Sequence, residues 1–472
     1  MFDRFFRWLR GVIDRMLDSK TAKRMGITVA ISDGMQQAIH RWIDMYRGKA
    51  PWLTPNPQHL GLPALIASEM ATMVMLEAEV NVTGSPRADW LAEQFRPLTD
   101  HLRLAVEYAC AEGGLVFKPY VDGKDIAVDL VHADDFYPTA FNSRREITGA
   151  VFVERKRVGE TRYMRLEAHQ ITDQGYRITN RAFKGTGEDS FTQEVPLTDV
   201  DEWADLQPEV NIQNVDHPLF GYLRIPLGNT IDPKSPVGVS VYEKASGVIE
   251  EADKQYQRLL WEYEGGELAI DAVEDAFETD QKTKQVRLPV GRERLFRPNK
   301  LDPKDASDEG LFHTFSPALR DASYIQGLNK LLQRVEDLCG ISRGTLSDPN
   351  EDARTAQEIK QTRQRTYSTV TSIQRATQKA VEALLTAMDT LATLYKLCPA
   401  GKYEAAFVWD DSIVVDAETE RQRDMNEVRD GLMNKWEYRV KWRGESEEQA
   451  KAALAEAEDP TDDELLDFEP KA

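Results

Sequence analysis

Two long helical patterns that flank a short module constrain the fold of this chain more than any other feature. The first covers residues 240–264 with one glycine inside it, and the second covers 318–339. At 1.5 Å per residue the first helix would span about 37 Å, which is longer than a typical globular helix. Residues 267–316 between them contain several prolines and short strand patterns. This arrangement predicts a stalk of two helices that carries a small head.

The segment before this stalk predicts a mixed α+β body. Apolar residues recur at helical spacing over 33–47, 62–79 and 90–112. Alternating β-branched and aromatic residues, separated by glycine-containing turns, then predict a series of strands between residues 116 and 183. The turn-forming run 232–236 separates this body from the stalk.

After the stalk the sequence predicts one very long helix and a shorter helical region. Residues 355–396 contain neither glycine nor proline, so nothing interrupts the helical pattern. A strand is expected over 403–415, and helices are expected over 418–433 and 446–458. The strongly acidic residues 459–472 are expected to be disordered.

The composition is that of an acidic globular protein. Hydrophobic residues make up 41% of the chain and charged residues 29%, so a sizeable core can form. The formal net charge of −21 would repel nucleic acid over most of the surface and restrict any DNA contact to a local or transient one. The three cysteines are widely spaced, which argues against a disulfide framework and favours a reducing compartment.

The first 26 residues have an amphipathic pattern and not that of a secretion signal. Apolar residues such as Phe5, Phe6 and Leu9 recur at helical spacing and are interrupted by Arg4 and Arg7. Such a helix can lie on a membrane surface or pack against protein, and we favour protein because most amphipathic helices bury against it. No segment reaches the ~20 uncharged apolar residues of a transmembrane helix, so no membrane partner is expected.

The sequence motifs that usually carry catalysis are absent. There is no P-loop, no GxGxxG, no HExxH and no GxSxG. The seven histidines have no His or Cys partner at metal-ligand spacing. The pairs Asp134-Asp135 and Asp410-Asp411 are expected to cap or edge secondary structure, because no basic or nucleophilic group accompanies them. We therefore expect no enzyme, no cofactor and no metal site.

One helical segment reverses the acidic character of the chain. Residues 354–381 contain six basic residues and a single acid, Glu358. Two explanations stay open: a surface that faces DNA phosphates, or a helix that pairs with acidic neighbours in this chain or an adjacent subunit. The acidic run 445–469 favours a solvated face.

Several motifs occur in a characteristic order and spacing across nearly the whole chain, although no single one is specific. The N-terminal helical pattern contains Ser32, Met35, Trp42 and Tyr46. The other motif segments are 238–256, 319–329, 340–347, 355–367, 410–413 and 431–438. Together their order and spacing resemble those of siphophage-type portal proteins of tailed bacteriophages.

The resemblance implies an α+β portal fold in which long helices surround a central channel in a ring of twelve subunits. The wing would comprise 27–237 and the strand 397–415, and the stem would consist of the helices 238–264 and 317–340. The remaining regions would be the N-terminal arm 1–26, the clip 265–316, the tunnel loop 341–354, the long helix 355–396 and the crown helices 416–458.

The resemblance also implies that the ring sits at one capsid vertex and passes double-stranded DNA during packaging and ejection. The clip would dock the terminase large subunit and later a head-completion or adaptor protein. The wing would meet the major capsid protein and the scaffold, with assembly in the host cytoplasm and a final place in the virion. Four basic residues near the tunnel loop are the candidates for phosphate contact: Arg343, Arg354, Lys360 and Arg363.

Three other functions need to be distinguished from this one. The first is a structural connector or minor capsid protein without a DNA channel, which ring stoichiometry and a central hole would separate. The second is a terminase-like nuclease, which would need an ATP loop or clustered acids and would cleave DNA with Mg²⁺. The third is a peripheral membrane protein that uses residues 2–17, and vesicle co-sedimentation would detect it.

Overall fold

The computed structural model describes residues 29–76, 78–185, 191–273, 277–279, 286–288, 295–299, 312–348, 356–409 and 417–458. They form two compact units that divide after Trp409. The first unit combines helices with antiparallel sheets and the second is helical in its described part, so the chain as a whole has the predicted α+β class. The expected N-terminal arm 1–26 and the acidic tail 459–472 lie outside the described residues. No helix in the described part is both long and apolar enough to cross a membrane.

The first helices differ from their predicted boundaries in two places. Helix α3 (Asp33–Tyr46) begins where expected, since the side chain of Ser32 accepts a hydrogen bond from the backbone of Met35. The helix predicted over 62–79 ends earlier, because β1 (Glu79–Thr83) follows α4 (Leu62–Val74). The helix predicted over 90–112 is wrong as one element. It is divided into α5 (Pro86–Thr99), whose last turn contains the helix-breaking Pro97, and α6 (Leu102–Glu112).

The predicted strands form two antiparallel sheets. The larger sheet has the order β4-β5-β6-β7-β8, and β9 also pairs with β7. The smaller has the order β10-β2-β3. Phe136, Phe152 and Phe220 pack together in the core between them, with Val116 from the smaller sheet. The bounds are β2 (Gly114–Asp122), β3 (Asp125–Val131), β4 (Phe136–Phe141), β5 (Ile147–Val158), β6 (Thr161–Thr172), β7 (Gly175–Gly185), β8 (Phe191–Val195), β9 (Glu209–Ile212) and β10 (Gly221–Arg224).

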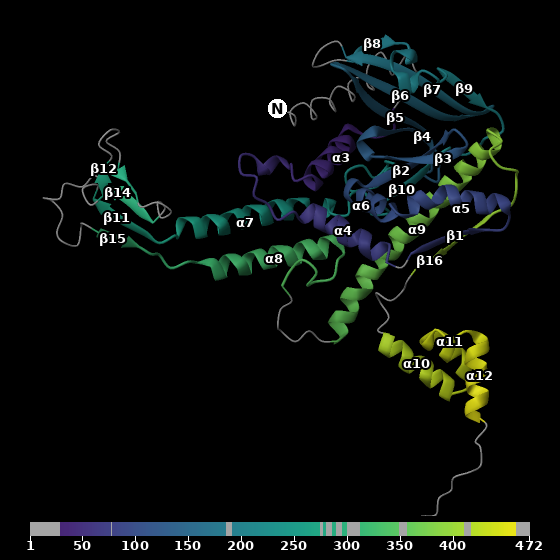
Figure 1. The fold of residues 1–472 in the computed structure, drawn as a ribbon. Coiled ribbons are helices and arrows are strands. Elements are labelled where there is room, and N and C mark those ends of the chain that lie inside the picture. The colour runs from purple at the N-terminus through teal and green to yellow at the C-terminus, as the bar shows by residue number, and fades with distance from the viewer. Residues whose placement is uncertain are drawn as a thin grey trace, which may run out of the picture. The chain divides into compact units, whose positions relative to one another are not determined.

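The long helix is a single element, α9 (Ala356–Leu394), and it forms part of the core of the first unit (Figure 1). Its apolar residues Leu384, Leu385 and Met388 are fully buried, and it packs against β10, β2 and α4. A Cβ added to Gly221 in β10 would lie 2.2 Å from the carbonyl oxygen of Ala380, so this close approach requires glycine.

The strand expected over 403–415 is shorter than predicted. It is β16 (Glu404–Val408), and residues 410–416 lie outside the described part. β16 pairs antiparallel with β1, so that Glu79 lies opposite Val408. The pairing joins two segments more than 300 positions apart, which no local pattern announces.

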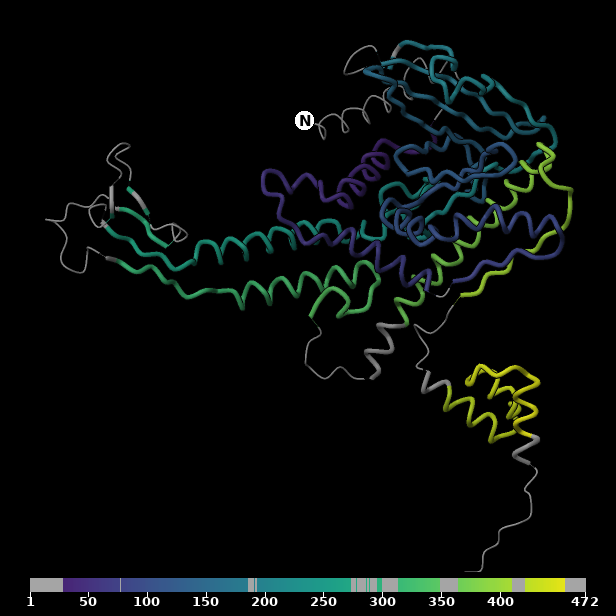
Figure 2. The backbone as a smooth tube through the Cα atoms, viewed as in Figure 1, coloured from purple at the N-terminus to yellow at the C-terminus, as the bar shows by residue number. Residues whose placement is uncertain are grey.

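Two antiparallel helices lie side by side in the first unit (Figures 1 and 2). They are α7 (Ser246–Gly265) and α8 (Asp321–Cys339). The described strands between them form a three-stranded sheet of order β14-β11-β15 and a two-stranded ribbon. These are β11 (Ala269–Val273), β14 (Phe296–Asn299), β15 (Phe312–Phe315), β12 (Glu278–Thr279) and β13 (Val286–Arg287).

The first helix of this pair begins six residues later than the sequence suggests. The helical pattern starts at Ser240, but the chain there is tied to the end of α6. The backbone N–H of Val241 donates to the carbonyl of Cys110 at 2.9 Å, and a Cβ on Gly238 would lie 2.2 Å from the Gly113 oxygen. Tertiary contacts therefore override the local helical preference up to α7.

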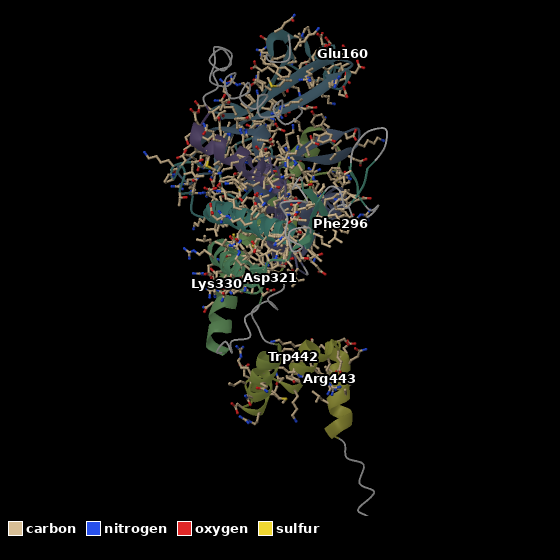
Figure 3. All side chains as sticks on the ribbon, turned by 90° about the vertical axis from the view of Figure 1, so that its left-hand side faces the viewer. Glu160, Phe296, Asp321, Lys330, Trp442 and Arg443 are labelled. Carbon is tan, nitrogen blue, oxygen red and sulfur yellow. The ribbon has the colours of Figure 1, made fainter. Side chains whose placement is uncertain are left out.

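The second unit contains three helices: α10 (Ala417–Arg429), α11 (Lys435–Arg443) and α12 (Glu447–Glu458). The sequence predicted the outer two and missed α11, whose start is fixed by a capping box between Asn434 and Glu437. Trp442 on α11, labelled in Figure 3, donates its indole N–H to Asp424 at 3.0 Å. A further hydrogen bond from Lys441 is the main reason that the pKa of Asp424 is lowered.

Candidate functional site

The antiparallel helices α7 and α8 are called the hairpin from here on. An ion pair between Glu262 and Arg320 joins the two helices at the distal end of the hairpin. Glu262 accepts hydrogen bonds from the Arg320 guanidinium at 3.0 and 2.6 Å and from the Arg320 backbone N–H at 3.1 Å. The Arg320 side chain is the main reason that the pKa of Glu262 is lowered. Further along, Gln255 donates to the Tyr324 carbonyl at 3.4 Å. Polar contacts thus cross-link the distal half of the hairpin.

A segment of the body braces α7 from outside at two points. Glu243, just before α7, accepts hydrogen bonds from the Trp42 indole and from Arg41. Asp253, within α7, accepts from the Trp52 indole and from the backbone N–H of Leu60, both at 2.9 Å. The two tryptophans are ten positions apart in the sequence, and so are the two acids. The brace restricts how α7 can tilt against the body.

The loop after α8 is organised around one buried carboxylate. Glu336 is fully buried, and one of its oxygens accepts from the backbone N–H groups of Gly344, Leu346 and Ser347 at 3.0, 2.6 and 2.9 Å. The other oxygen accepts from the Ser347 hydroxyl at 2.8 Å. Gly340 has a φ of +73°, which ends α8 and starts the turn. A buried charge with four donors holds the loop in one conformation.

Arg343 is the one sequence-predicted contact residue whose side chain can be placed. Its guanidinium donates to both Asp337 oxygens at 3.0 and 2.7 Å, and its side chain remains 48% exposed. This contact lowers the pKa of Asp337. Arg365 from α9 donates to the Asp337 carbonyl at 3.4 Å, so two arginines converge on the end of α8.

The side chains of the other three candidate residues lie outside the described part of the chain. Arg354 lies outside the described residues, and so do the side chains of Lys360 and Arg363, although their backbone belongs to α9. A phosphate contact by any of the four therefore stays a prediction.

Sequence reasoning missed the carboxylates that fix this region. The only signal for Glu336 was an acid four residues before the glycine that ends the helix. Asp253 had no signal, because its partners Trp52 and Leu60 lie about 200 positions away. Such pairs become visible only when the chain is folded.

A second buried charged cluster stabilises the larger sheet. Glu167 accepts hydrogen bonds from Lys118 at 2.8 Å and His169 at 2.7 Å, and Arg165 lies 2.9 Å away. A neutral imidazole has one N–H, which His169 donates to Glu167, so its other nitrogen accepts from the Tyr176 hydroxyl at 2.9 Å. Burial lowers the pKa of His169, so the imidazole is neutral. Every member is satisfied, which fits a structural role.

The acidic pairs considered in the sequence have different positions. Asp134 and Asp135 lie in a short 3₁₀ turn, where Asp135 pairs with Arg155. Burial raises the Asp135 pKa to about 6 despite that arginine. The pair 410–411 lies outside the described residues. Within the described ranges, no group of three or more His, Cys, Asp or Glu side chains is arranged to hold a metal ion.

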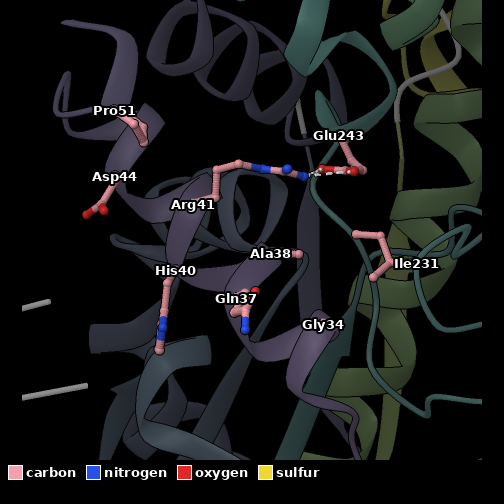
Figure 4. A pocket seen from close by; sticks show the side chains of 9 residues that line it. All are labelled: Gly34, Gln37, Ala38, His40, Arg41, Asp44, Pro51, Ile231 and Glu243. Carbon is pink, nitrogen blue, oxygen red and sulfur yellow. Dashed lines mark hydrogen bonds and ion pairs between the residues drawn. The ribbon is translucent and has the colours of Figure 1, made fainter. Parts of the chain in front are cut away.

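An open hollow of about 550 Å³ lies along α3, and its lining is shown in Figure 4. The ion pair between Arg41 and Glu243 borders it, and His40, Asp44 and Ile231 contribute further polar and apolar surface. The charges are mixed and the hollow is open to solvent. Nothing in this lining resembles a nucleophile with its base, or a set of converging cations for a phosphate.

The contacts described above are structural: a braced helical hairpin, a loop fixed by a buried carboxylate and a fully satisfied charge cluster in the sheet. The chain matches the family described as Phage portal protein, SPP1 Gp6-like, over residues 88–463, and it belongs to that family. The resemblance noted in the sequence is thereby confirmed. This family is structural and not enzymatic.

No curated protein matches the chain. Among solved structures, a chain from the neck of the native GTA particle, computed with C12 symmetry, is 12% identical. The match covers 86% of this chain and 97% of that chain, with a TM-score of 0.33.

Proposed function

We propose that the chain is the portal subunit of a tailed-phage head. Twelve copies would form a ring at one capsid vertex, and double-stranded DNA would pass through it during packaging and ejection. The observation that carries the proposal is the family match over residues 88–463, which includes the hairpin, α9 and the second unit. The contacts of α7 with Trp42 and Trp52 and the Glu262–Arg320 ion pair support the proposal. Helices that surround a channel in every subunit must keep their conformation while DNA passes.

The regions of the chain are assigned accordingly. The wing comprises 27–237 and 397–415, and the stem comprises 238–264 and 317–340, with α7 and α8 as its helices. The module 265–316 is the clip, where the terminase large subunit and then a head-completion or adaptor protein dock. The tunnel loop is 341–354, and the crown is 416–458. The wing contacts the major capsid protein and the scaffold, and the assembled ring remains in the virion.

DNA contact in this ring is brief and independent of sequence. The four candidate residues for this contact lie in or after the tunnel loop: Arg343, Arg354, Lys360 and Arg363. An acidic channel surface elsewhere would repel DNA and keep it from binding tightly. Charge reversal at Arg343 and Arg354 is expected to impair packaging or DNA retention. Unchanged packaging and retention in the double variant would refute this assignment.

The test of the proposed function is the particle that the full-length chain forms. Native mass spectrometry is expected to give about twelve times the 53.6 kDa subunit mass, and negative-stain images are expected to show a central hole. A monomer or a closed particle without a hole would contradict the proposal. The second result would favour a connector or minor capsid component instead.

A further inference from the structure

The second unit, described over residues 417–458, has a thin core. Within residues 421–454, whose side-chain burial the structure describes, only Asp424 and Ala450 are buried. Met425 on α10 is 56% exposed, and Leu432 in the turn after α10 is 80% exposed. A unit well below about 70 residues rarely builds a sufficient core by itself. The three helices therefore leave apolar surface that another segment can cover.

Apolar and basic side chains meet on one side of this unit. The hydroxyl of Tyr438 on α11 accepts a hydrogen bond from the Arg421 guanidinium at 3.1 Å and lies 3.8 Å from the Met425 sulfur. Lys435 precedes Tyr438 by three positions, so the two lie on the same side of α11. Arg421 and Lys435 are both exposed. This surface, called the α10–α11 patch, is defined by Arg421, Met425, Lys435 and Tyr438.

The charge of α11 sets it apart from the other helices of the unit. It contains four basic residues and one acid, whereas acids outnumber bases in α10 and α12. Two of its cations already have partners, since Arg439 pairs with Glu445 and Lys441 with Asp424, both at 2.7 Å. Positive charge beside exposed apolar side chains favours a ligand that combines acidic and apolar residues. The α10–α11 patch is therefore suited to an acidic peptide that carries apolar side chains.

The segment that follows α12 has the matching composition. Residues 459–472, called the tail, contain six acids and one lysine, and the apolar Leu465, Leu466 and Phe468 occur among the acids. Fourteen residues reach about 46 Å when extended, whereas α10, the longest helix of the unit, spans about 20 Å. The tail is therefore long enough to return to any surface of its own unit. The family match ends at residue 463, before these three apolar residues.

We propose that residues 462–469 of the tail bind the α10–α11 patch of their own chain. The three apolar residues of the tail cover the apolar side chains of the patch, and the flanking acids lie beside Arg421 and Lys435. Acidic composition keeps such a segment unfolded by itself, and segments of this kind become ordered when they bind. The contact does not depend on the proposed ring, because both partners belong to one unit. The tail of a neighbouring copy is the alternative occupant that the test must separate.

Disulfide cross-linking of the full-length protein tests the contact directly. The test variant combines Met425→Cys with Leu466→Cys, and the control combines Glu448→Cys with Leu466→Cys. Glu448 is exposed and lies two positions from the buried Ala450, so it faces away from the core of the unit. Both variants also carry Cys398→Ser, which removes the native thiol that is not buried. Non-reducing denaturing gels follow the reaction after mild oxidation, at low and at high salt.

We expect the test pair to form a disulfide within one chain about tenfold faster than the control pair, because binding raises the effective concentration of the two thiols. High salt should slow the test pair and leave the control pair unchanged, since it screens the acids of the tail from the cations of the patch. Equal rates for the two pairs would overturn the inference. A band of dimer mass from the test pair would also overturn it and assign the patch to the tail of a neighbouring copy.

Hydrogen exchange followed by mass spectrometry gives a second measurement without introduced cysteines. The triple variant Leu465→Ser, Leu466→Ser and Phe468→Ser removes the apolar residues of the tail and leaves its charge unchanged. The amides of α10 and α11 are expected to exchange several-fold faster in this variant. The control variant, Pro460→Ser with Pro470→Ser, alters the tail outside the proposed contact and should exchange like the wild type. Unchanged exchange in the triple variant would show that the tail does not cover the patch.

Discussion

Replacing Glu336 with glutamine removes one buried negative charge while the shape of the side chain hardly changes. The carboxylate satisfies four donors, three of them backbone N–H groups of the loop after α8. A neutral amide oxygen has two lone pairs for three N–H groups, and the amide nitrogen replaces the oxygen that faces the Ser347 hydroxyl. About two donors therefore lose their acceptor in a buried place.

The size of the effect follows from those two donors. Each buried donor left without a partner costs about 1–3 kcal/mol, so for two donors we expect a loss of about 2–6 kcal/mol. The neighbouring variant Asp337→Asn provides the control, since it removes the partner of Arg343 at a position that is partly exposed. Solvent screening limits its effect to less than about 1 kcal/mol.

Hydrogen exchange followed by mass spectrometry measures this effect locally, which is preferable in a chain of two units. In Glu336→Gln the amides of Leu346 and Ser347 are expected to exchange from roughly thirty to about ten thousand times faster, since 1.4 kcal/mol corresponds to a factor of ten. In Asp337→Asn they should change by less than about tenfold. Equal protection of these amides in both variants would show that the carboxylate does not hold the loop.

Three further predictions follow from other contacts. Burial lowers the folded-state pKa of His169 below its usual 6.5, so the unfolded chain takes up a proton first as the pH falls; stability is full above about pH 6.5 and declines below it. His169→Gln should reduce this decline in thermal melts recorded from neutral to mildly acidic pH, and an unchanged pH profile would contradict the assignment. Trp52→Phe leaves the buried Asp253 carboxylate with one donor fewer, which should cost about 1–3 kcal/mol of local stability. Hydrogen exchange within α7 should become faster; unaltered exchange would show that this hydrogen bond does not stabilise α7. Gly221→Ala places a Cβ against the backbone of α9 and should cost at least 1–3 kcal/mol in denaturant unfolding, whereas Gly228→Ala, with open space around it, should be near neutral; similar midpoints would argue against the close packing of α9.

The fold elements that the sequence predicted best are those with long, uninterrupted local patterns. α9 has no glycine or proline over 39 residues, and its boundaries differ from the prediction by only one or two positions. β5, β6 and β7 were visible because each alternates side chains between two faces. The short α11 was missed, because its nine residues contain too little periodicity to distinguish it from a loop.

The candidate site was less accessible to sequence reasoning. Arg343 was recognised as a cation near a loop, but its pairing with Asp337 depends on how the chain turns after Gly340.

By itself the sequence determined the helical and strand segments, the acidic charge and the likeness to portal proteins, because periodicity, charge and motif order are local or additive properties of the chain. The tertiary structure decided where α7 begins, which strand pairs with β1, and which carboxylates become buried and need donors. Those outcomes depend on contacts between residues that are dozens to hundreds of positions apart. The free energy of such a contact arises only when folding removes water from both partners at once.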